Sequence, residues 1–372
     1  MLGIYCPERY LGRSLTERGD ELSAAKGLSL SSTQGQVEAG RACGICRGTT
    51  GNKVHSIREM MFGFRDVFQY LECGACGCVQ LLNPPQDLGR YYPSGYSAFR
   101  SVEAPDTVLQ HIWENIRDYA RERRNQGYFE GAGWLDRLLA RRYEYPQLES
   151  FARMRASRQV RVLDVGCGSG RLLLDLKKLG YENLLGVDPF IPKAIDYGNG
   201  VRVMKEGLEN LAGTKWDVIM FHHAFEHMPD PAKVLRFTAN LLAPNGHCLI
   251  RIPVVARAWE QYGANWVQLD APRHLFLQTE RSFQLLAHRE GLRVYKVTYD
   301  SNESQFWASE LYSRDIPLRE VSAREVKSLF GATRMKEYRR RALEMNGQGV
   351  GDQAAFYLVG GNEAPADSVA SE

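Results

Sequence analysis

The sequence predicts an α/β protein built on a seven-stranded, doubly wound sheet, with a small cysteine-rich module ahead of it. From Gln159 onward, short runs of β-branched and apolar residues alternate with stretches of helical periodicity, which is typical of a parallel sheet covered by helices. Before that region, five of the eight cysteines lie in close-spaced clusters between Cys43 and Cys78. A chain of 372 residues is long enough for one such domain and an appended module.

The seven expected strands follow the runs of apolar and β-branched residues. They are 160–165, 183–188, 201–206, 216–222, 246–254, 291–300 and 353–360. About fifty residues separate the last two strands, which predicts a helical insertion over about 301–350. We interpret the basic run 319–341 within it as a solvated helix face.

Composition and periodicity divide the chain into five segments. Residues 1–40, rich in Ser, Gly, Gln and Glu, predict a disordered tail, as do residues 362–372. The cysteine-rich module covers 41–100, a helical linker or cap covers 101–158, and the α/β domain covers 159–361.

Overall charge argues against two classes of partner. The formal net charge is +3 with 24% charged residues, so no global field favours wrapping nucleic acid or coating an anionic membrane. No apolar run approaches the roughly 20 residues needed to span a bilayer. Charge interrupts the N-terminus before an apolar signal region can form, so we expect a cytoplasmic protein.

A glycine-rich turn follows the first expected strand and precedes a helical stretch, in the run DVGCGSG that contains Asp164, Gly166, Gly168 and Gly170. Glycines let the backbone turn tightly and approach a ligand, and the helix start offers unpaired N–H groups. Dinucleotide-binding folds use nearly the same spacing. However, Asp164 would repel a pyrophosphate and suits a cation, while Asp188 at the end of the second strand can accept ribose hydroxyls. Together they favour S-adenosylmethionine as the cofactor.

Five successive motifs resemble those of the class I S-adenosylmethionine-dependent methyltransferases. They are DVGCGSG, GVDP, EGLENL, WDVIMFHHAFEHMPDP and LLAPNGHCLIRIP, in order over about residues 159–300. The sequence most resembles the branch with ubiquinone-pathway O-methyltransferases and methyltransferases of bacterial polysaccharide and secondary-metabolite clusters. The resemblance implies a Rossmann-like domain in which Gly207 and Leu208 flank the adenine, and His222 and His223 lie under the methyl group.

Two CxxC pairs, Cys43 with Cys46 and Cys73 with Cys76, predict a structural zinc site. Four thiolates close a tetrahedron and leave no position for water. Cys78 could replace Cys76 as the fourth ligand, and buried free cysteines or a redox pair are the alternative. The module resembles zinc-ribbon-like segments that precede some methyltransferase domains, which implies a role in holding a substrate or the partner of a homodimer.

The acceptor pocket is expected at the carboxyl ends of the strands, where doubly wound sheets bind ligands. His223 follows the fourth strand and His274 lies in the segment after the fifth, so both are candidate bases for an acceptor hydroxyl. Packing or supporting roles are the alternative for both. We interpret His227 as structural, bracing its loop with Glu226.

The leading hypothesis is methylation, at oxygen, of a small molecule or a glycan precursor. One alternative is an RNA methyltransferase that holds RNA with the zinc module and the basic run 319–341. The small net charge and the lack of an [N/D]PP-aromatic signature in the catalytic loop argue against RNA, making nucleic acid an unexpected partner. The other alternative is a non-catalytic scaffold. The complete set of cofactor-site residues, from Asp164 through the glycines of the turn to Asp188, argues against it.

Overall fold

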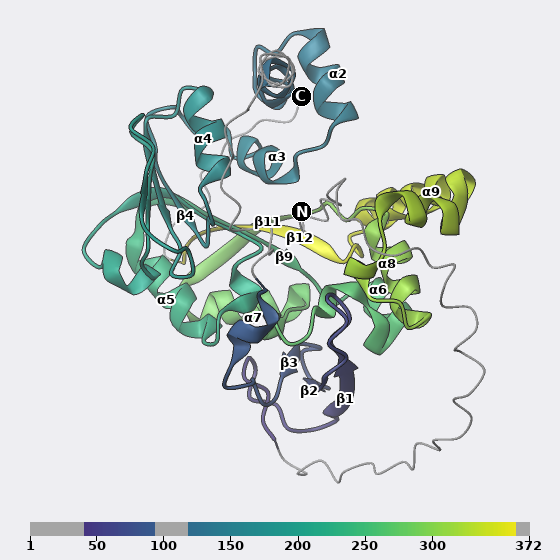
Figure 1. The fold of residues 1–372 in the computed structure, drawn as a ribbon. Coiled ribbons are helices and arrows are strands. Elements are labelled where there is room, and N and C mark those ends of the chain that lie inside the picture. Colours follow the sequence, from purple (N-terminus) through teal and green to yellow (C-terminus); the bar gives the residue numbers. More distant parts are fainter. Residues whose placement is uncertain (1–40, 94–117, 362–372) are drawn as a thin grey trace, which may run out of the picture.

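A computed structural model of the chain describes residues 41–93 and 118–361 (Figure 1). The expected tails 1–40 and 362–372, and the beginning of the expected helical linker at 101–117, lie outside the described residues.

The main sheet contains all seven expected strands. It has eight strands in the order β11-β12-β9-β8-β4-β5-β7-β6. Their bounds are β4 (Arg161–Val165), β5 (Asn183–Val187), β6 (Ile195–Asp196), β7 (Arg202–Met204), β8 (Trp216–His222), β9 (Leu242–Pro253), β11 (Leu292–Tyr299) and β12 (Gln353–Gly360). The short strand β6 is the only addition in this sheet to the predicted set.

Strand order creates a switch point at β4. The chain runs outward from β4 to β5 and β7 on one side, then returns to β8 and β9 on the other side, with these pairings parallel. β12 is antiparallel to both β9 and β11. In doubly wound sheets such a reversal opens a crevice beyond the carboxyl ends of the strands, and the crevice is where ligands bind.

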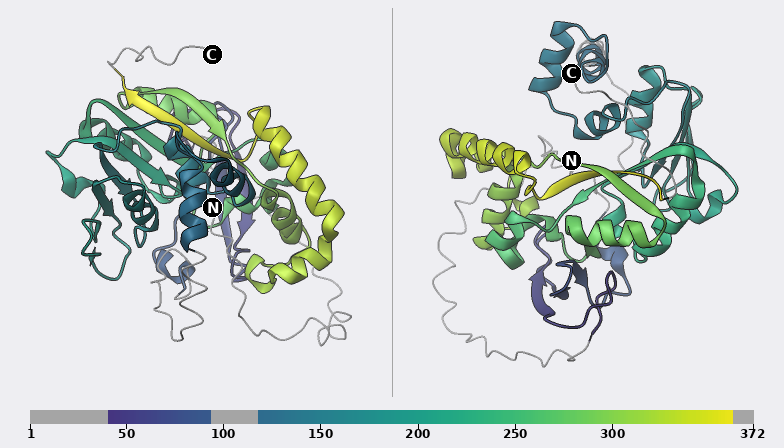
Figure 2. Two further views of the ribbon diagram at one scale, coloured as in Figure 1. Left: turned by 90° about the horizontal axis from the view of Figure 1, so that it is seen from above. Right: turned by 180° about the vertical axis from the view of Figure 1, so that it is seen from behind.

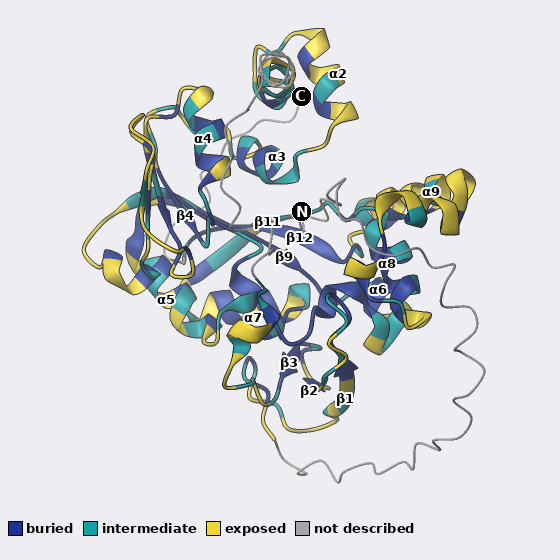
Figure 3. Ribbon diagram, viewed as in Figure 1, coloured by how far each residue is buried: buried dark blue, intermediate teal, exposed yellow. Residues whose placement is uncertain are grey.

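Helices cover both faces of the sheet. Their bounds are α2 (Trp134–Arg142), α3 (Pro146–Ala152), α4 (Arg171–Lys178), α5 (Pro231–Leu241), α6 (Arg257–Tyr262), α7 (Glu280–Arg289), α8 (Ser304–Ser313) and α9 (Ala323–Gly347). Apolar residues of α5 and α7 pack on one face and those of α3 and α4 on the other. The strands between them are largely buried (Figure 3). None of the helices in the described part of the chain is both long and apolar enough to cross a membrane.

The expected insertion between the last two strands is helical, formed by α8, the 3₁₀ turn η8 (Leu318–Glu320) and α9. Helix α9 lies at the edge of the molecule in Figure 2. Its arginines form exposed ion pairs, such as Arg340 with Glu337 and Glu344. These pairs are consistent with a solvated helix face over 319–341.

The cysteine-rich module shares a sheet with the α/β region. Strands β1 (Lys53–Arg58), β2 (Val67–Glu72) and β3 (Val79–Leu81) are joined by β10 (Phe276–Leu277), which pairs antiparallel with β3. Side chains from the module also pack in the same apolar cluster as α7. The module is therefore built onto the segment that follows β9, below α7 in Figure 1.

Candidate functional site

The glycine turn lies at the carboxyl end of β4. Gly166, Gly168 and Gly170 have φ of 71°, 55° and 74°, a region that side chains with a Cβ rarely adopt. A Cβ on Gly166 would lie 2.4 Å from the Cβ of Ala224, and one on Gly170 would lie 2.7 Å from Cγ2 of Val203. The turn therefore requires glycine at both positions for space as well as for conformation.

Two buried carboxylates flank this turn. Asp188 follows β5, and its Oδ2 accepts from the N–H of Gly168 at 2.9 Å while Oδ1 accepts from the N–H of Phe190 at 2.9 Å. Asp164 is 4% exposed, and burial, with the nearby charge of Asp188, raises its pKa well above the usual range. A cationic ligand would offset the burial of the Asp164 charge and its repulsion by Asp188. Carboxylate oxygens also accept hydrogen bonds from hydroxyls, so this pair suits a ligand that carries positive charge and hydroxyls.

Gly207 and Leu208 lie beyond the end of β7. Gly207 has extended backbone and precedes the 3₁₀ turn η4 (Leu208–Leu211). The side chain of Leu208 is 6% exposed and packs in the same cluster as Val187. The N–H of Asp188 donates to the carbonyl of Met204 at 3.0 Å, which joins the ends of β5 and β7.

His222 ends β8 with both ring nitrogens buried and without a partner among the described residues. Burial, and secondarily the charge of Arg251, lowers its pKa well below the usual range, so the ring is neutral. The strand register pairs His222 with Arg251, so the two side chains leave the sheet on the same face. Nη2 of Arg251 is also buried without a partner. Buried polar atoms of this kind are uncommon, and here they fit a ligand at the carboxyl edge.

His223 is held on both sides by the protein. Its Nδ1 donates to Oε1 of Glu226 at 3.2 Å, and its Nε2 accepts from Nη1 of Arg251. Its φ of 53° is unusual for a residue with a side chain. Burial, with a smaller effect of Arg251, lowers its pKa well below the usual range.

His274 reaches the same carboxylate from the segment after β9. Its Nδ1 donates to the carbonyl of Gln268 at 2.7 Å, and its Nε2 lies 4.0 Å from Oε1 of Glu226. Glu226 is fully buried, and burial raises its pKa to about 8. The two histidines predicted to face the acceptor thus both lie near Oε1 of Glu226.

His227 connects the two loops. Its Nδ1 donates to the carbonyl of Arg273 at 2.9 Å and lies 3.2 Å from the hydroxyl of Tyr92, which precedes the undescribed segment 94–117. Its ring packs edge to face on His274, with centroids 4.7 Å apart. The hydrogen bond thus joins His227 to Arg273, whereas the brace expected from the sequence was with Glu226.

A buried ion-pair network that the sequence analysis did not anticipate fixes the loop of His274. Arg273 is fully buried; its Nε and Nη2 donate to the Asp270 carboxylate at 3.0 and 2.6 Å, and Nη2 also donates to Glu59 at 2.9 Å. Glu59 belongs to the cysteine-rich module and is 214 residues away in sequence. Only the tertiary structure could reveal this pair.

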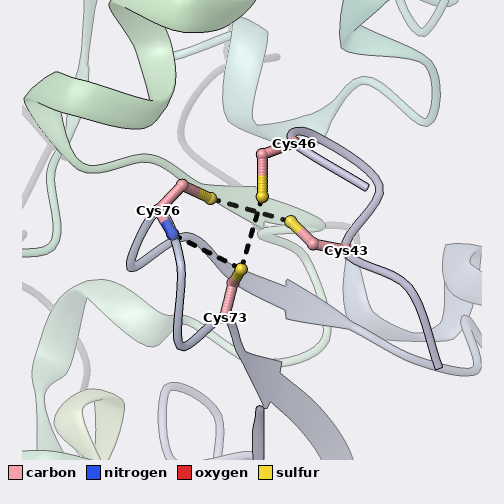
Figure 4. Close-up of side chains that lie close together, drawn as sticks. All are labelled: Cys43, Cys46, Cys73 and Cys76. Carbon is pink, nitrogen blue, oxygen red and sulfur yellow. Dashed lines mark hydrogen bonds between the residues drawn. The ribbon is translucent and has the colours of Figure 1, made fainter. Parts of the chain in front are cut away.

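The four cysteines of the two CxxC pairs form one cluster (Figure 4). Sγ of Cys43 lies 3.7 Å from that of Cys76, and Sγ of Cys46 lies 3.5 Å from that of Cys73. Sulfurs about 2.3 Å from one tetrahedral ion lie about 3.8 Å apart, so these residues fit zinc. Cys78, the alternative fourth ligand, is outside the group of four.

Comparison with known proteins finds similarity to methyltransferases. Residues 123–297 match a family model described as a methyltransferase domain. The chain is 35% identical over 95 residues to the ubiquinone biosynthesis O-methyltransferase of Serratia proteamaculans (strain 568), covering 23% of this chain and 39% of that protein. It is 32% identical over 96 residues to the enzyme of the same name from Proteus mirabilis (strain HI4320), with the same coverage of 23% and 39%. The chain therefore spans about two fifths of the length of these curated relatives.

Two solved structures are similar at low identity. One is a complex between the Haloferax volcanii Trm112 methyltransferase activator and a methyltransferase, at 17% identity and a TM-score of 0.40, covering 69% of this chain and 99% of that chain. The other is the cyclopropane synthase MmaA2 from Mycobacterium tuberculosis, at 18% identity and a TM-score of 0.34, covering 54% and 78%.

Proposed function

We propose that the chain, whose residues 123–297 match a model described as a methyltransferase domain, is a class I S-adenosylmethionine-dependent methyltransferase that transfers the methyl group of this cofactor to an oxygen of a small acceptor. When bound, the cofactor supplies a methyl group on a sulfonium that is already an activated leaving group. The protein then has to position both reactants, exclude water and manage the proton of the acceptor hydroxyl.

The observation that carries the proposal is the pair of buried carboxylates on the glycine turn. Asp164 and Asp188 are 4% and 5% exposed, and they lie at the switch point of the sheet. Asp164 would offset a positive charge on the amino acid end of the cofactor, and Asp188 would accept from the ribose hydroxyls. Gly207 and Leu208 would flank the adenine, as the family resemblance implies.

The acceptor would lie against the residues at the carboxyl end of β8. The unpartnered ring of His222 supports a ligand there. Of the two candidate bases, His274 is better placed, because its Nδ1 carries the proton and the lone pair is on Nε2. Nε2 of His223 already accepts from Arg251, so His223 would orient Glu226 and serve as the alternative base.

The cysteine cluster supports a structural zinc ion bound by Cys43, Cys46, Cys73 and Cys76. Two hydrogen bonds join this site to α7: Thr279 donates to the carbonyl of Cys76 at 2.7 Å, and Arg289 donates to the carbonyl of Ile45 at 2.6 Å. The ion would thereby stabilise the segment that carries β10 and follows His274.

The test is transfer of label from methyl-labelled S-adenosylmethionine to three acceptor sets: hydroxylated aromatic compounds, nucleotide sugars with glycan precursors, and total RNA. We expect labelling of a hydroxyl acceptor in one of the first two sets. His274→Gln should lower that turnover by about 10²–10⁴-fold, and the exposed His288→Gln control should leave it unchanged. Labelling of RNA alone would contradict the small acceptor, and cofactor binding without transfer to any set would favour the scaffold.

A further inference from the structure

A second group of ligating side chains lies beside the acceptor face, separate from the cysteines. Glu226, His227 and His274 each offer one ligand atom, and these atoms all lie within 4.8 Å of one another. Two of the residues come from the 3₁₀ turn η5 (Phe225–His227) after β8, and the third comes from the segment after β9. Two histidines and a carboxylate form a common ligand set for divalent transition metals.

The hydrogen bonds of the two histidines fix their tautomers. Nδ1 of His227 faces the carbonyl of Arg273 at 2.9 Å, and Nδ1 of His274 faces the carbonyl of Gln268 at 2.7 Å. A carbonyl oxygen only accepts, so each Nδ1 carries a proton and each neutral ring keeps its lone pair on Nε2. Metal-binding histidines are usually oriented in this way, with the other ring nitrogen donating to a backbone carbonyl or a carboxylate.

Electron-pair donors face one another in this cluster. Nε2 of His274 lies 3.8 Å from Oδ2 of Asp270 and 4.0 Å from Oε1 of Glu226. Oε2 of Glu226 is buried and has no hydrogen-bond partner among the described residues. Buried acceptors that face one another are costly unless a cation, either a proton or a metal ion, lies between them.

We propose that Glu226, His227 and His274 bind one divalent first-row transition metal ion at the acceptor side of the site. Ligands about 2.0–2.2 Å from one ion lie about 3.0–3.5 Å apart, so binding draws Nε2 of His274 and the Glu226 carboxylate together by less than about 1 Å. His227 is only partly buried, whereas Glu226 and His274 are buried. The consequence for chemistry rests on the proposed function: the ion would lower the pKa of an acceptor hydroxyl bound to it, the hydroxyl proton would pass to solvent, and His274 would serve as a ligand of the ion and not as the base.

The test uses full-length protein whose cysteine site is loaded with zinc, equilibrated with Co²⁺ and freed of unbound metal. Elemental analysis counts cobalt per chain, and visible absorption distinguishes ligation by nitrogen and oxygen from ligation by thiolate. We expect one bound cobalt ion, with weak d–d bands and no sulfur-to-metal charge transfer. Glu226→Gln and His274→Gln should each lose it, while the exposed His288→Gln control should keep it.

Wild-type protein that binds no cobalt beyond the cysteine site overturns the proposal, and the cluster is then satisfied by a shared proton. Equal cobalt binding by wild type, Glu226→Gln and His274→Gln also overturns it. Thermal unfolding of each variant checks folding, and the wild-type count decides the question even if a variant does not fold. Calorimetry with S-adenosylmethionine on the same samples tests the proposed function separately, because cofactor binding without cobalt binding overturns only the metal site.

Discussion

Arg273 joins the cysteine-rich module to the loop of His274, and its replacement by methionine should destabilise both. The Arg273 side chain is fully buried and donates to Asp270 and Glu59, which are also almost completely buried. A methionine keeps much of the volume and removes all the donors. The two carboxylates would then remain buried without their partner.

The expected cost follows from that burial. Removing one partner of a buried ion pair typically costs about 3–5 kcal/mol, because it leaves an uncompensated charge. Arg161 and Asp217 offer a matched control, since they form a two-bond pair of 2.9 and 2.8 Å on the surface with side chains 46% and 32% exposed. Arg161→Met should cost much less than Arg273→Met, because solvent screens an exposed ion pair.

Chemical denaturation measures both costs, and hydrogen exchange locates the change. We expect Arg273→Met to speed exchange in the loop at 266–275 and in β1 to β3, with little change in β4 and β5. Adding Glu59→Gln to Arg273→Met should recover part of the loss, because one of the two uncompensated charges is removed. A cost for Arg273→Met no larger than that for Arg161→Met, or no recovery in the double variant, would refute the reasoning.

Elemental analysis should find about one zinc per chain in the cysteine module, and Cys46→Ser should release it and lower the thermal midpoint; metal-free protein with slow exchange in β1 to β3 would contradict this. Gly170→Ala should destabilise the protein more than Gly198→Ala, because the two glycines share a positive φ of 74° and 70° but only the Cβ at Gly170 would meet Val203. Denaturant unfolding measures both, and equal costs would show that the close contact is relieved. Cofactor affinity should rise with pH, by up to about tenfold per pH unit, until the pH exceeds the raised pKa of Asp164. The reason is that a cationic ligand binds the ionised Asp164 carboxylate, so binding below that pKa displaces the proton of Asp164. Calorimetry across pH tests this against Asp164→Asn, which should bind more weakly and show no such slope.

The main sheet could be predicted from local patterns because each buried strand is an apolar run bounded by turn residues. The strand 216–222 agrees with β8 to the residue. Strand β6 was missed because it has only two residues and is defined by its pairing with β7. Strand β10 was missed for the same reason, since Phe276 and Leu277 form a strand only against β3.

The glycine turn and the cysteine cluster could be predicted because their residues follow one another at short, fixed spacings. Arg251 was missed although it left a signal, as a single charge within the apolar run CLIRIP of β9. The ion pair between Glu59 and Arg273 could not be predicted, because neither the residues around them nor their spacing in the sequence indicates a contact. The orientation of the histidine rings depends on backbone carbonyls of other segments, such as that of Gln268, and no sequence pattern encodes it.

Calorimetric titration of the full-length protein with S-adenosylmethionine tests the central claim most directly. We expect one cofactor per chain, and Asp188→Ala should weaken binding by about 2–4 kcal/mol, because the ribose hydroxyls would lose charge-assisted hydrogen bonds. Asp217→Ala, a change at the opposite end of β8, should leave the affinity unchanged. No binding by the wild-type protein, or equal affinity of wild type and Asp188→Ala, would contradict a cofactor site at the carboxyl edge of the sheet.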